Sequence, residues 1–247
     1  MTQLKIEPVH GTLPENTYEH LRDLIIRGRI PAGGRIVEAE IALRFGISRT
    51  PVREALAWLA HEGYLVPGST GLRTELVVAP LTTDEVQELW AMIGALEGHA
   101  ASAVAGLPKA RRQDLAKDLK RLNSELLEAS KVRPRDLDLL FELQTAFHVR
   151  FVYEIAGRRF RNIYDRIRPH VQRYEWAYAT RAEAEYEPSA NEHSLIIAAI
   201  KAGDRGKARN SVESHWRRAA RRTIAIIDSL SERNAPRRRE RSARTGS

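Results

Sequence analysis

The sequence contains no cysteine. This absence excludes disulfide bonds and thiolate ligands, so any bound metal ion must be held by nitrogen or oxygen atoms. The sequence also has no apolar run near the roughly 18 residues that a membrane-spanning helix requires. Its first 30 residues lack the apolar core of a secretory signal peptide. We therefore expect a soluble, cytoplasmic protein.

Basic charge, in contrast, is in excess. The formal net charge is +8 over 247 residues, a value common among nucleic-acid-binding proteins. Much of the excess lies in the terminal run 233–247, which holds six arginines and one glutamate. We expect this run to be a disordered basic tail, which either adds non-specific attraction to phosphate or simply stays solvated. Bulk charge therefore says little about the rest of the chain.

The N-terminal third shows three short helical patterns followed by a hairpin pattern. Gly46 and Ser48 lie between the second and third helices, where a tight turn and an N-cap are expected. The expected ranges are 14–28, 37–46 and 49–61 for the helices, and 64–67 and 74–80 for the strands. Two helices joined by a tight turn and followed by a hairpin predict a winged helix-turn-helix.

Hydrogen-bonding side chains gather at the start of the third expected helix. The planar fork of arginine can donate two hydrogen bonds to a guanine, and serine and threonine hydroxyls suit phosphate oxygens. The residues are Ser48, Arg49, Thr50 and Arg53. The ordinary alternative is a solvated helix start in which Arg53 pairs with Glu54 or another carboxylate.

The run from Pro31 to Tyr64, PAGGRIVEAEIALRFGISRTPVREALAWLAHEGY, resembles the winged helix of GntR-type regulators. The matching residues are Glu38, Ile41, Ala42, Ser48, Arg49, Pro51, Val52, Arg53, Glu54, Ala55, Leu56, Leu59, Glu62 and Gly63. The resemblance implies that Arg49 and Arg53 contact bases. It also implies that Ser48 and Thr50 hold phosphate, and that a homodimer binds palindromic double-stranded operator DNA.

Two departures from the GntR pattern concern further DNA contacts. Ala39 stands where some relatives have a DNA-contacting arginine, and the expected wing is a few residues longer than usual. Gly71 and Arg73 are our candidates for the wing residues that contact DNA.

From Leu81 onward the sequence shows long stretches of 3.6-residue periodicity and no strand pattern. The expected helices are 83–105, 109–131, 135–156, 159–181, 189–202 and 205–231. We therefore expect a mainly α fold with an N-terminal winged helix-turn-helix and a C-terminal helical bundle. The parts are a DNA-binding domain over 1–80, an effector-binding and dimerisation domain over 81–232, and the tail over 233–247.

Three histidines, His148, His193 and His215, each lie beside an apolar stripe of an expected helix. A histidine in such a place is most often a partly buried side chain with one hydrogen bond. Three histidines on separate helices can also converge when a bundle folds. Their imidazole nitrogens would then suit zinc, nickel or another divalent ion, with open positions for an effector carboxylate.

Residues 81–232 are similar to the all-helical domain of the FCD, or FadR-like, branch of GntR regulators. The matching residues are Phe147, His148, His193, Ile196, Ala199, Ile200, Asp204, Ala208 and His215. In that branch an Asp or Asn four residues before the first histidine joins three histidines around a metal ion. The resemblance implies that this position here is Gln144, a neutral and weaker ligand.

Other departures concern the effector of the helical domain. Ile93 stands where the branch often has an arginine, and Arg158 replaces a common asparagine. The cations left near the expected pocket, our candidate effector ligands, are Arg150, Arg166 and Arg173. Nearby aromatic residues either line the cavity or fill the core. They are Tyr174, Trp176 and Tyr178.

These observations predict a transcriptional regulator, repressor or activator, and not an enzyme. A small effector, expected to be a carboxylate-bearing metabolite, would change the affinity of the DNA-binding domain for its operator. One alternative is a metal-responsive regulator in which the ion itself is the signal. A metal-dependent hydrolase is the weakest alternative, because no carboxylate near a histidine ligand is arranged as a general base would need.

Overall fold

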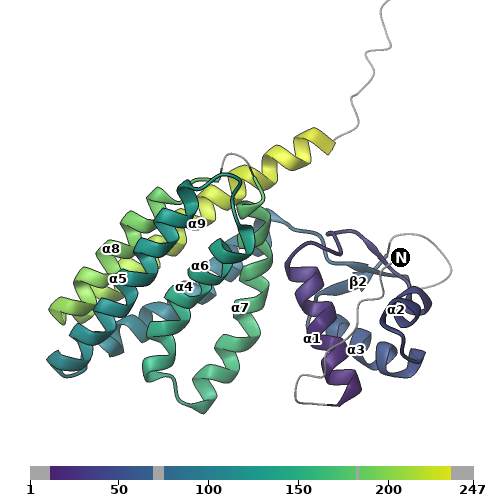
Figure 1. Cartoon of the computed structure of the whole chain (residues 1–247), viewed down its shortest axis with the longest axis horizontal. Helices are drawn as coiled ribbons and strands as arrows, with labels where there is room; N and C mark the ends of the chain where they lie inside the picture. Colours follow the sequence, from purple (N-terminus) through teal and green to yellow (C-terminus); the bar gives the residue numbers. More distant parts are fainter. Residues whose placement is uncertain (1–11, 69–74, 182–183, 235–247) are drawn as a thin grey trace, which may run out of the picture.

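The computed structural model describes residues 12–68, 75–181 and 184–234, which form an N-terminal domain and a helical domain (Figure 1). The N-terminal domain contains three helices and a small antiparallel sheet with strand order β1-β3-β2. The helices are α1 (Leu13–Ile26), α2 (Glu38–Phe45) and α3 (Arg49–His61), and the strands are β1 (Arg35–Ile36), β2 (Leu65–Pro67) and β3 (Leu76–Val78). This is a winged helix-turn-helix.

The turn between α2 and α3 depends on Gly46, which has φ +69°. This left-handed conformation is easy for glycine and costly for other residues, so Gly46 ends α2 and lets α3 start at a new angle. Val52, Ala55 and Leu59 on α3 are completely buried against the core of this domain. Apolar burial on one face of α3 therefore leaves its opposite face free.

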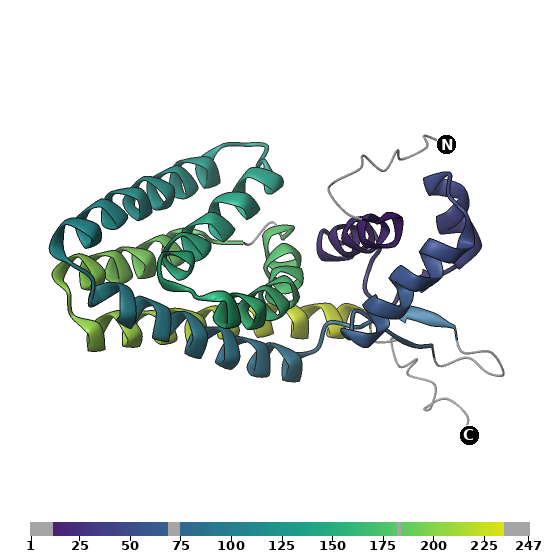
Figure 2. The same ribbon diagram turned by 90° about the horizontal axis from the view of Figure 1, so that it is seen from below.

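The helical domain is an antiparallel bundle in which the long helices α4 and α9 run side by side (Figure 2). Gly94 on α4 permits this close approach, because a Cβ atom there would lie 3.3 Å from the Cβ of Trp216. The helices are α4 (Thr83–Ala105), α5 (Lys109–Lys131), α6 (Leu137–Ile155), α7 (Arg158–Ala179), α8 (Glu187–Ala202) and α9 (Arg205–Asn234).

The two domains contact each other through α7. The Arg173 guanidinium donates a 2.7 Å hydrogen bond to the carbonyl of Ala79, at the end of the hairpin. The rings of Tyr64 and His170 stack with centroids 4.2 Å apart. A small apolar cluster joins Ile26 on α1 to residues of the bundle, and its other buried members are Phe141 and Trp176.

The expected fold class is confirmed: the chain is mainly helical, with a winged helix-turn-helix followed by a helical bundle. The helix bounds agree with the expected ones within about three residues. The two-residue strand β1 was not expected, because so short a segment has no periodicity and exists only by pairing with β3. None of the helices in the described part of the chain is both long and apolar enough to cross a membrane.

Candidate functional site

The first candidate site is the exposed face of α3. Ser48 is the N-cap residue of α3, yet its hydroxyl makes no capping hydrogen bond. Ser48, Arg49, Thr50 and Arg53 are all exposed. The N-terminus of α3 therefore presents two hydroxyls, two guanidiniums and free backbone N–H groups, a combination that suits phosphate and base edges.

Both arginines on this face bind one carboxylate, that of Glu38 at the start of α2. Arg49 Nε lies 2.9 Å from Glu38 Oε1, and Arg53 Nη2 lies 3.0 Å from the same oxygen. Hydrogen bonds from Arg53, and then from Arg49, hold the pKa of Glu38 below its ordinary value of 4.5. The sequence interpretation considered Glu54 or another carboxylate as the partner of Arg53, and in the structure that carboxylate is Glu38.

The proposed wing contacts cannot be placed in the same way. Gly71 and Arg73 lie outside the described residues, as does most of the basic tail. Strands β2 and β3 pair antiparallel, with Leu65 opposite Val78, as the hairpin prediction required.

The second candidate site is a cluster of three buried histidines. His148 on α6, His193 on α8 and His215 on α9 are each 1% exposed or less. One ring nitrogen from each lies within 4.8 Å of the corresponding atoms of the other two. The bundle therefore brings together the three histidines that the sequence singled out.

The Nδ1 atom of each histidine contacts a different polar side chain. His148 Nδ1 is 2.7 Å from Glu97 Oε2, and His215 Nδ1 is 2.8 Å from Glu192 Oε2. His193 Nδ1 is 3.0 Å from Asn123 Oδ1. Such contacts orient the rings and fix the proton on Nδ1, which leaves Nε2 as a lone-pair donor.

The Nε2 atoms of His193 and His215 are buried and have no hydrogen-bond partner among the described residues. Burial is the main cause that lowers the pKa of His193 well below 6.5, and the neighbouring histidines lower it further. Burial also lowers the pKa of His215, although the hydrogen bond that its Nδ1–H donates to Glu192 opposes this shift. Both rings are therefore neutral near pH 7, which is the form that binds a metal ion.

Gln144 lies beside the histidine cluster and contacts His148. Its Nε2 lies 3.3 Å from His148 Nε2, and its Oε1 is buried without a partner in the described part of the chain. A rotation of the amide would direct the oxygen toward the histidines. Oriented imidazoles with unpaired Nε2 atoms and one unpaired amide oxygen fit a divalent ion that prefers nitrogen and oxygen ligands.

The carboxylates behind the histidines are ionised. Burial would raise the pKa of Glu97, but His148 and Arg168, together with a hydrogen bond from Trp216, lower it below 4.5. Burial likewise opposes ionisation of Glu192, but hydrogen bonds from His215 and Arg222 lower its pKa to about 2. Sequence reasoning did not find these groups, because they lie 23 or more residues from the histidines that they contact.

A cavity opens beside the histidine cluster, with a volume of about 60 Å³. His215 and Gln144 belong to its wall, so the cavity adjoins the histidine cluster on one side. Five aromatic residues also line it: Trp90, Phe141, Tyr178, Tyr186 and Trp216. Its other polar lining residues are Glu175, Glu185, Ser189, Arg222 and Thr223.

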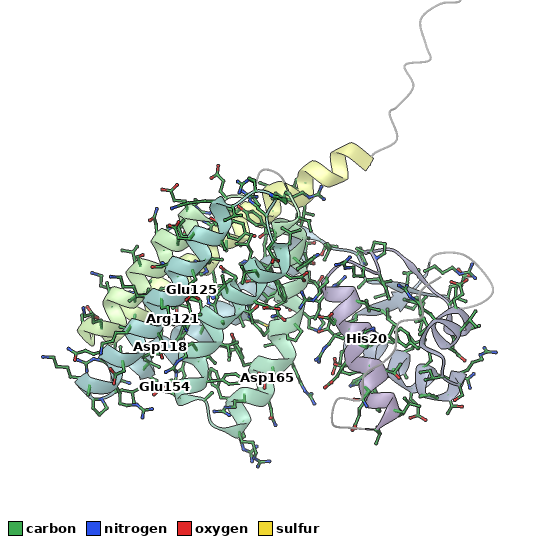
Figure 3. All side chains as sticks on the ribbon, in the orientation of Figure 1. His20, Asp118, Arg121, Glu125, Glu154 and Asp165 are labelled. Carbon is green, nitrogen blue, oxygen red and sulfur yellow. The ribbon has the colours of Figure 1, made fainter. Side chains whose placement is uncertain are left out.

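The cations that the sequence suggested for the effector do not line this cavity. Arg150 binds Asp118 and Glu154, which lie in the half of the bundle away from the N-terminal domain (Figure 3). Arg166 lines a separate hollow with His61 and Glu62 of the N-terminal domain. Arg173 is buried at the domain junction. The cation of the cavity is Arg222, which sequence reasoning passed over as one of many arginines on α9.

The sequence did not decide whether three aromatic residues of α7 line the cavity or fill the core, and the structure places each of them differently. Tyr178 lines the cavity. Tyr174 is buried in the core and donates a hydrogen bond to Glu85, while Trp176 packs at the domain junction. Ile93, which stands in place of an arginine common in relatives, is completely buried in the bundle core.

Two family models match the chain, one in the N-terminal domain and one in the helical domain. Residues 13–67 match the model of bacterial regulatory proteins of the gntR family. Residues 88–218 match the FCD domain. The two matches together cover both the recognition helix and all three histidines.

Full-length relatives are regulators as well. The chain is similar to the gluconate operon transcriptional repressor of Bacillus subtilis (strain 168), with 29% identity over 202 residues that cover 79% of each protein. It is 26% identical to the HTH-type transcriptional regulator YdhC of the same organism, over 81% of this chain and 85% of YdhC.

Solved structures show the same fold. E. coli McbR/YncC superposes with a TM-score of 0.68 at 21% identity, over 90% of this chain and 99% of that chain. A GntR-type regulator from Rhodococcus sp. RHA1 gives a TM-score of 0.67 at 19% identity, over 86% and 97% of the two chains. The chain therefore belongs to the GntR family of bacterial regulatory proteins, in the branch with an FCD domain, and is a transcriptional regulator and not an enzyme.

Proposed function

We propose that this protein is a transcriptional repressor whose affinity for operator DNA changes when a small carboxylate binds beside a metal ion in the helical domain. The observation that carries the proposal is that three buried histidines cluster and that one of them, His215, also lines an adjacent cavity. Similarity to the gluconate operon repressor supports the sign of regulation.

For DNA, the proposal assigns base contacts to Arg49 and Arg53, and phosphate contacts to Ser48 and Thr50. The exposure of all four residues on the face of α3 opposite its buried side supports this assignment. Glu38 would release the two guanidiniums as they meet DNA. Two copies of the chain would bind the two halves of a palindromic site. Gly71 and Arg73 remain the candidates in the wing.

For the metal, His148, His193 and His215 would hold a zinc or nickel ion, with Gln144 as a weaker fourth ligand. Such an ion supplies a Lewis-acidic position at which a carboxylate oxygen can bind. Glu97, Asn123 and Glu192 would keep the three rings oriented through their Nδ1 atoms.

Phe141 offers the physical link between effector and DNA. It lines the cavity and also packs with Trp176, 5.4 Å between ring centroids, in the cluster that contains Ile26 of α1. A ligand that shifts Phe141 therefore changes the contact that holds the DNA-binding domain in place. By thermodynamic linkage, operator DNA must alter effector affinity by the same factor.

A second candidate function is a regulator in which the metal ion itself is the signal. Gln144 favours it, because a neutral amide in place of a carboxylate ligand implies weaker and reversible metal binding. In that case metal alone would change operator affinity.

The first experiment selects bound sequences from a random duplex pool with the purified full-length protein, at about 0.15 M salt. It is run with zinc, with nickel and with a chelator. We expect one short sequence with twofold symmetry. A site recovered only with metal, or only with chelator, supports the metal-signal alternative, whereas no consensus under any condition contradicts a sequence-specific regulator.

A further inference from the structure

We infer that the effector of this cavity is a small monocarboxylate with an aromatic body, and not a polyhydroxylated sugar acid. The inference rests on the proposed function and specifies the ligand class of the same site. The lining, the hydrogen-bond inventory, the charge and the size of the cavity each contribute to it.

The walls favour an aromatic ligand. Five aromatic side chains, contributed by several different helices, face the same small space. The rings of Trp90 and Trp216 are 6.0 Å apart at an interplanar angle of 85°, so they offer one ring face and one ring edge. Aromatic rings prefer such offset and edge-to-face contacts. Leu140, Ala179 and Ala219 make most of the remaining wall apolar.

The polar groups of the wall are only partly occupied, since Gln144 Oε1 and His215 Nε2 are buried without a hydrogen-bond partner among the described residues. Arg222 donates to both carboxylate oxygens of Glu192, at 2.9 and 3.0 Å, and to Ser189. The Tyr178 hydroxyl is engaged with the backbone of Glu185. Because most of the wall is aromatic or aliphatic, several hydroxyls of a sugar acid would lie against apolar side chains after losing their hydration, which lowers affinity.

One unpaired donor nevertheless lines the cavity. Trp90 is 3% exposed, and its indole N–H has no acceptor in the described part of the chain. A buried donor without a partner is costly, and an acceptor atom of a bound ligand would satisfy it. A carboxylate oxygen or one ring substituent is enough for this purpose.

The charges around the site favour a ligand with a single negative charge. Three carboxylates and two guanidiniums surround the histidines and the cavity: Glu97, Glu175, Glu192, Arg168 and Arg222. The exposed Arg218 and Glu185 add one charge of each sign. A divalent ion on the neutral histidines therefore leaves one unbalanced positive charge. One carboxylate neutralises it, while a dicarboxylate or a phosphate ester introduces excess negative charge into a half-buried place.

The cavity is smaller than the space that one aromatic ring occupies. The cavity volume is about 60 Å³, whereas a cavity of about 150 Å³ holds a benzene ring. Binding of a ring therefore requires a wall side chain to move outward. Phe141 is the wall residue that also packs against Trp176, so entry of the ring is coupled to the contact with the DNA-binding domain.

The test measures binding to the zinc-loaded full-length protein by calorimetry and by tryptophan fluorescence, which reports on Trp90 and Trp216 directly. The aromatic probes are benzoate, phenylacetate and 3-phenylpropionate. Three compounds serve for comparison. Phenylacetamide is the uncharged analogue of phenylacetate, phenylmalonate carries a second carboxylate, and D-gluconate represents the sugar acids. We expect the best aromatic monocarboxylate to bind at least about tenfold more tightly than each of these three comparison compounds.

A pair of variants on α9 locates the binding. Ala219→Leu fills the cavity and should abolish binding of the aromatic acid without changing zinc affinity. Ala225→Leu makes the same change at an exposed position of the same helix and should leave both unchanged. Trp90→Phe keeps a ring but removes the N–H donor, and should weaken the aromatic acid several-fold.

The outcomes separate this inference from the proposed function. Tighter binding of D-gluconate than of any aromatic acid, with a change in operator affinity, overturns the inference and leaves the function standing. Equal binding of phenylacetamide and phenylacetate overturns the monoanion requirement. If no acid in the set binds or alters operator affinity, both the inference and the effector part of the proposed function are contradicted.

Discussion

At the scale of single residues, the Glu38 carboxylate keeps together the two guanidiniums of α3 that we propose to contact DNA. Arg49 and Arg53 converge on it although both are largely exposed. Surface ion pairs of this kind contribute little to stability. Their effect is to hold two flexible side chains in one place, close to where they would meet a base pair.

Replacing Arg53 with alanine should weaken binding to the cognate operator by about 1 to 3 kcal/mol, because a bidentate contact to a base is lost. The fold should be unchanged, since this side chain is exposed. Fluorescence anisotropy with labelled operator measures the affinity, and circular dichroism checks the fold. Arg121→Ala, on the exposed surface of α5 (Figure 3), is the matched control. Unfolding of Arg53→Ala would contradict its assignment to the binding surface.

Substitution of Asn123 tests whether the residues that contact the Nδ1 atoms support metal binding. Its Oδ1 contacts His193 Nδ1, and substitution by alanine should lower zinc affinity by about 10- to 100-fold, because the ring loses its orientation. Competition with a chelating dye measures the affinity. Asn210→Ala, an exposed asparagine on α9, should have no effect. Equal zinc affinity of the two variants would show that Asn123 does not orient His193 for metal binding.

At the scale of elements, α7 connects the two parts of the molecule. Glu175 and Tyr178 on this helix line the cavity, while His170 and Trp176 contact the DNA-binding domain. A displacement of one helix can therefore change both sites. Pro169 lies inside α7 and lacks the N–H that would continue its hydrogen-bond ladder.

The contact between α1 and the bundle depends on Arg27. Its guanidinium lies 5.2 and 5.5 Å from the ring centroids of Phe141 and Trp176, and it also pairs with Asp138. We expect Arg27→Ala to increase amide hydrogen exchange in α1 while exchange in α4 and α9 stays the same. Arg29→Ala, at an exposed position two residues further on, should leave α1 protected. An unchanged α1 in Arg27→Ala would show that this contact does not hold the domain.

The stacked pair of Tyr64 and His170 makes the junction sensitive to pH. Burial is the main cause that lowers the pKa of His170 below its ordinary value of 6.5. The neutral ring is favoured in the folded state, so its contribution to stability is complete above pH 6.5 and is lost as the pH falls below that value.

Thermal unfolding of the wild-type protein and of His170→Phe, from pH 7.5 to 5.5, tests this expectation. The phenyl ring can still stack on Tyr64 but cannot take a proton. We expect the wild type to lose more stability than the variant over this range. Parallel losses in the two proteins would mean that His170 does not contribute to the pH dependence.

At the scale of the whole molecule, the recognition helix and the cavity that we propose for the effector lie in different domains, so the proposed regulation requires the domains to change their relative position or mobility. We expect two copies of the chain to bind one operator duplex, with half-sites about one turn of DNA apart. Sedimentation of the protein with the selected duplex gives the stoichiometry. One chain per duplex at saturation would contradict binding as a dimer.

The sequence by itself determined the elements and the residues that they carry. Helix bounds followed from apolar periodicity and from local signals such as Gly46. Exposure of Arg53 also followed, because the apolar face of α3 is fixed by the spacing of its own residues. The expected convergence of the three histidines depended on resemblance to a known family and not on spacing alone.

Only the tertiary structure decided which distant groups meet. Glu97 contacts His148 across 51 positions of sequence, and Arg222 contacts Glu192 across 30. The aromatic cavity likewise exists only after several helices have packed. Local periodicity specifies which face of a helix is buried. It does not specify which neighbour covers that face, since the many apolar contacts that set helix packing are collective and do not depend on sequence separation.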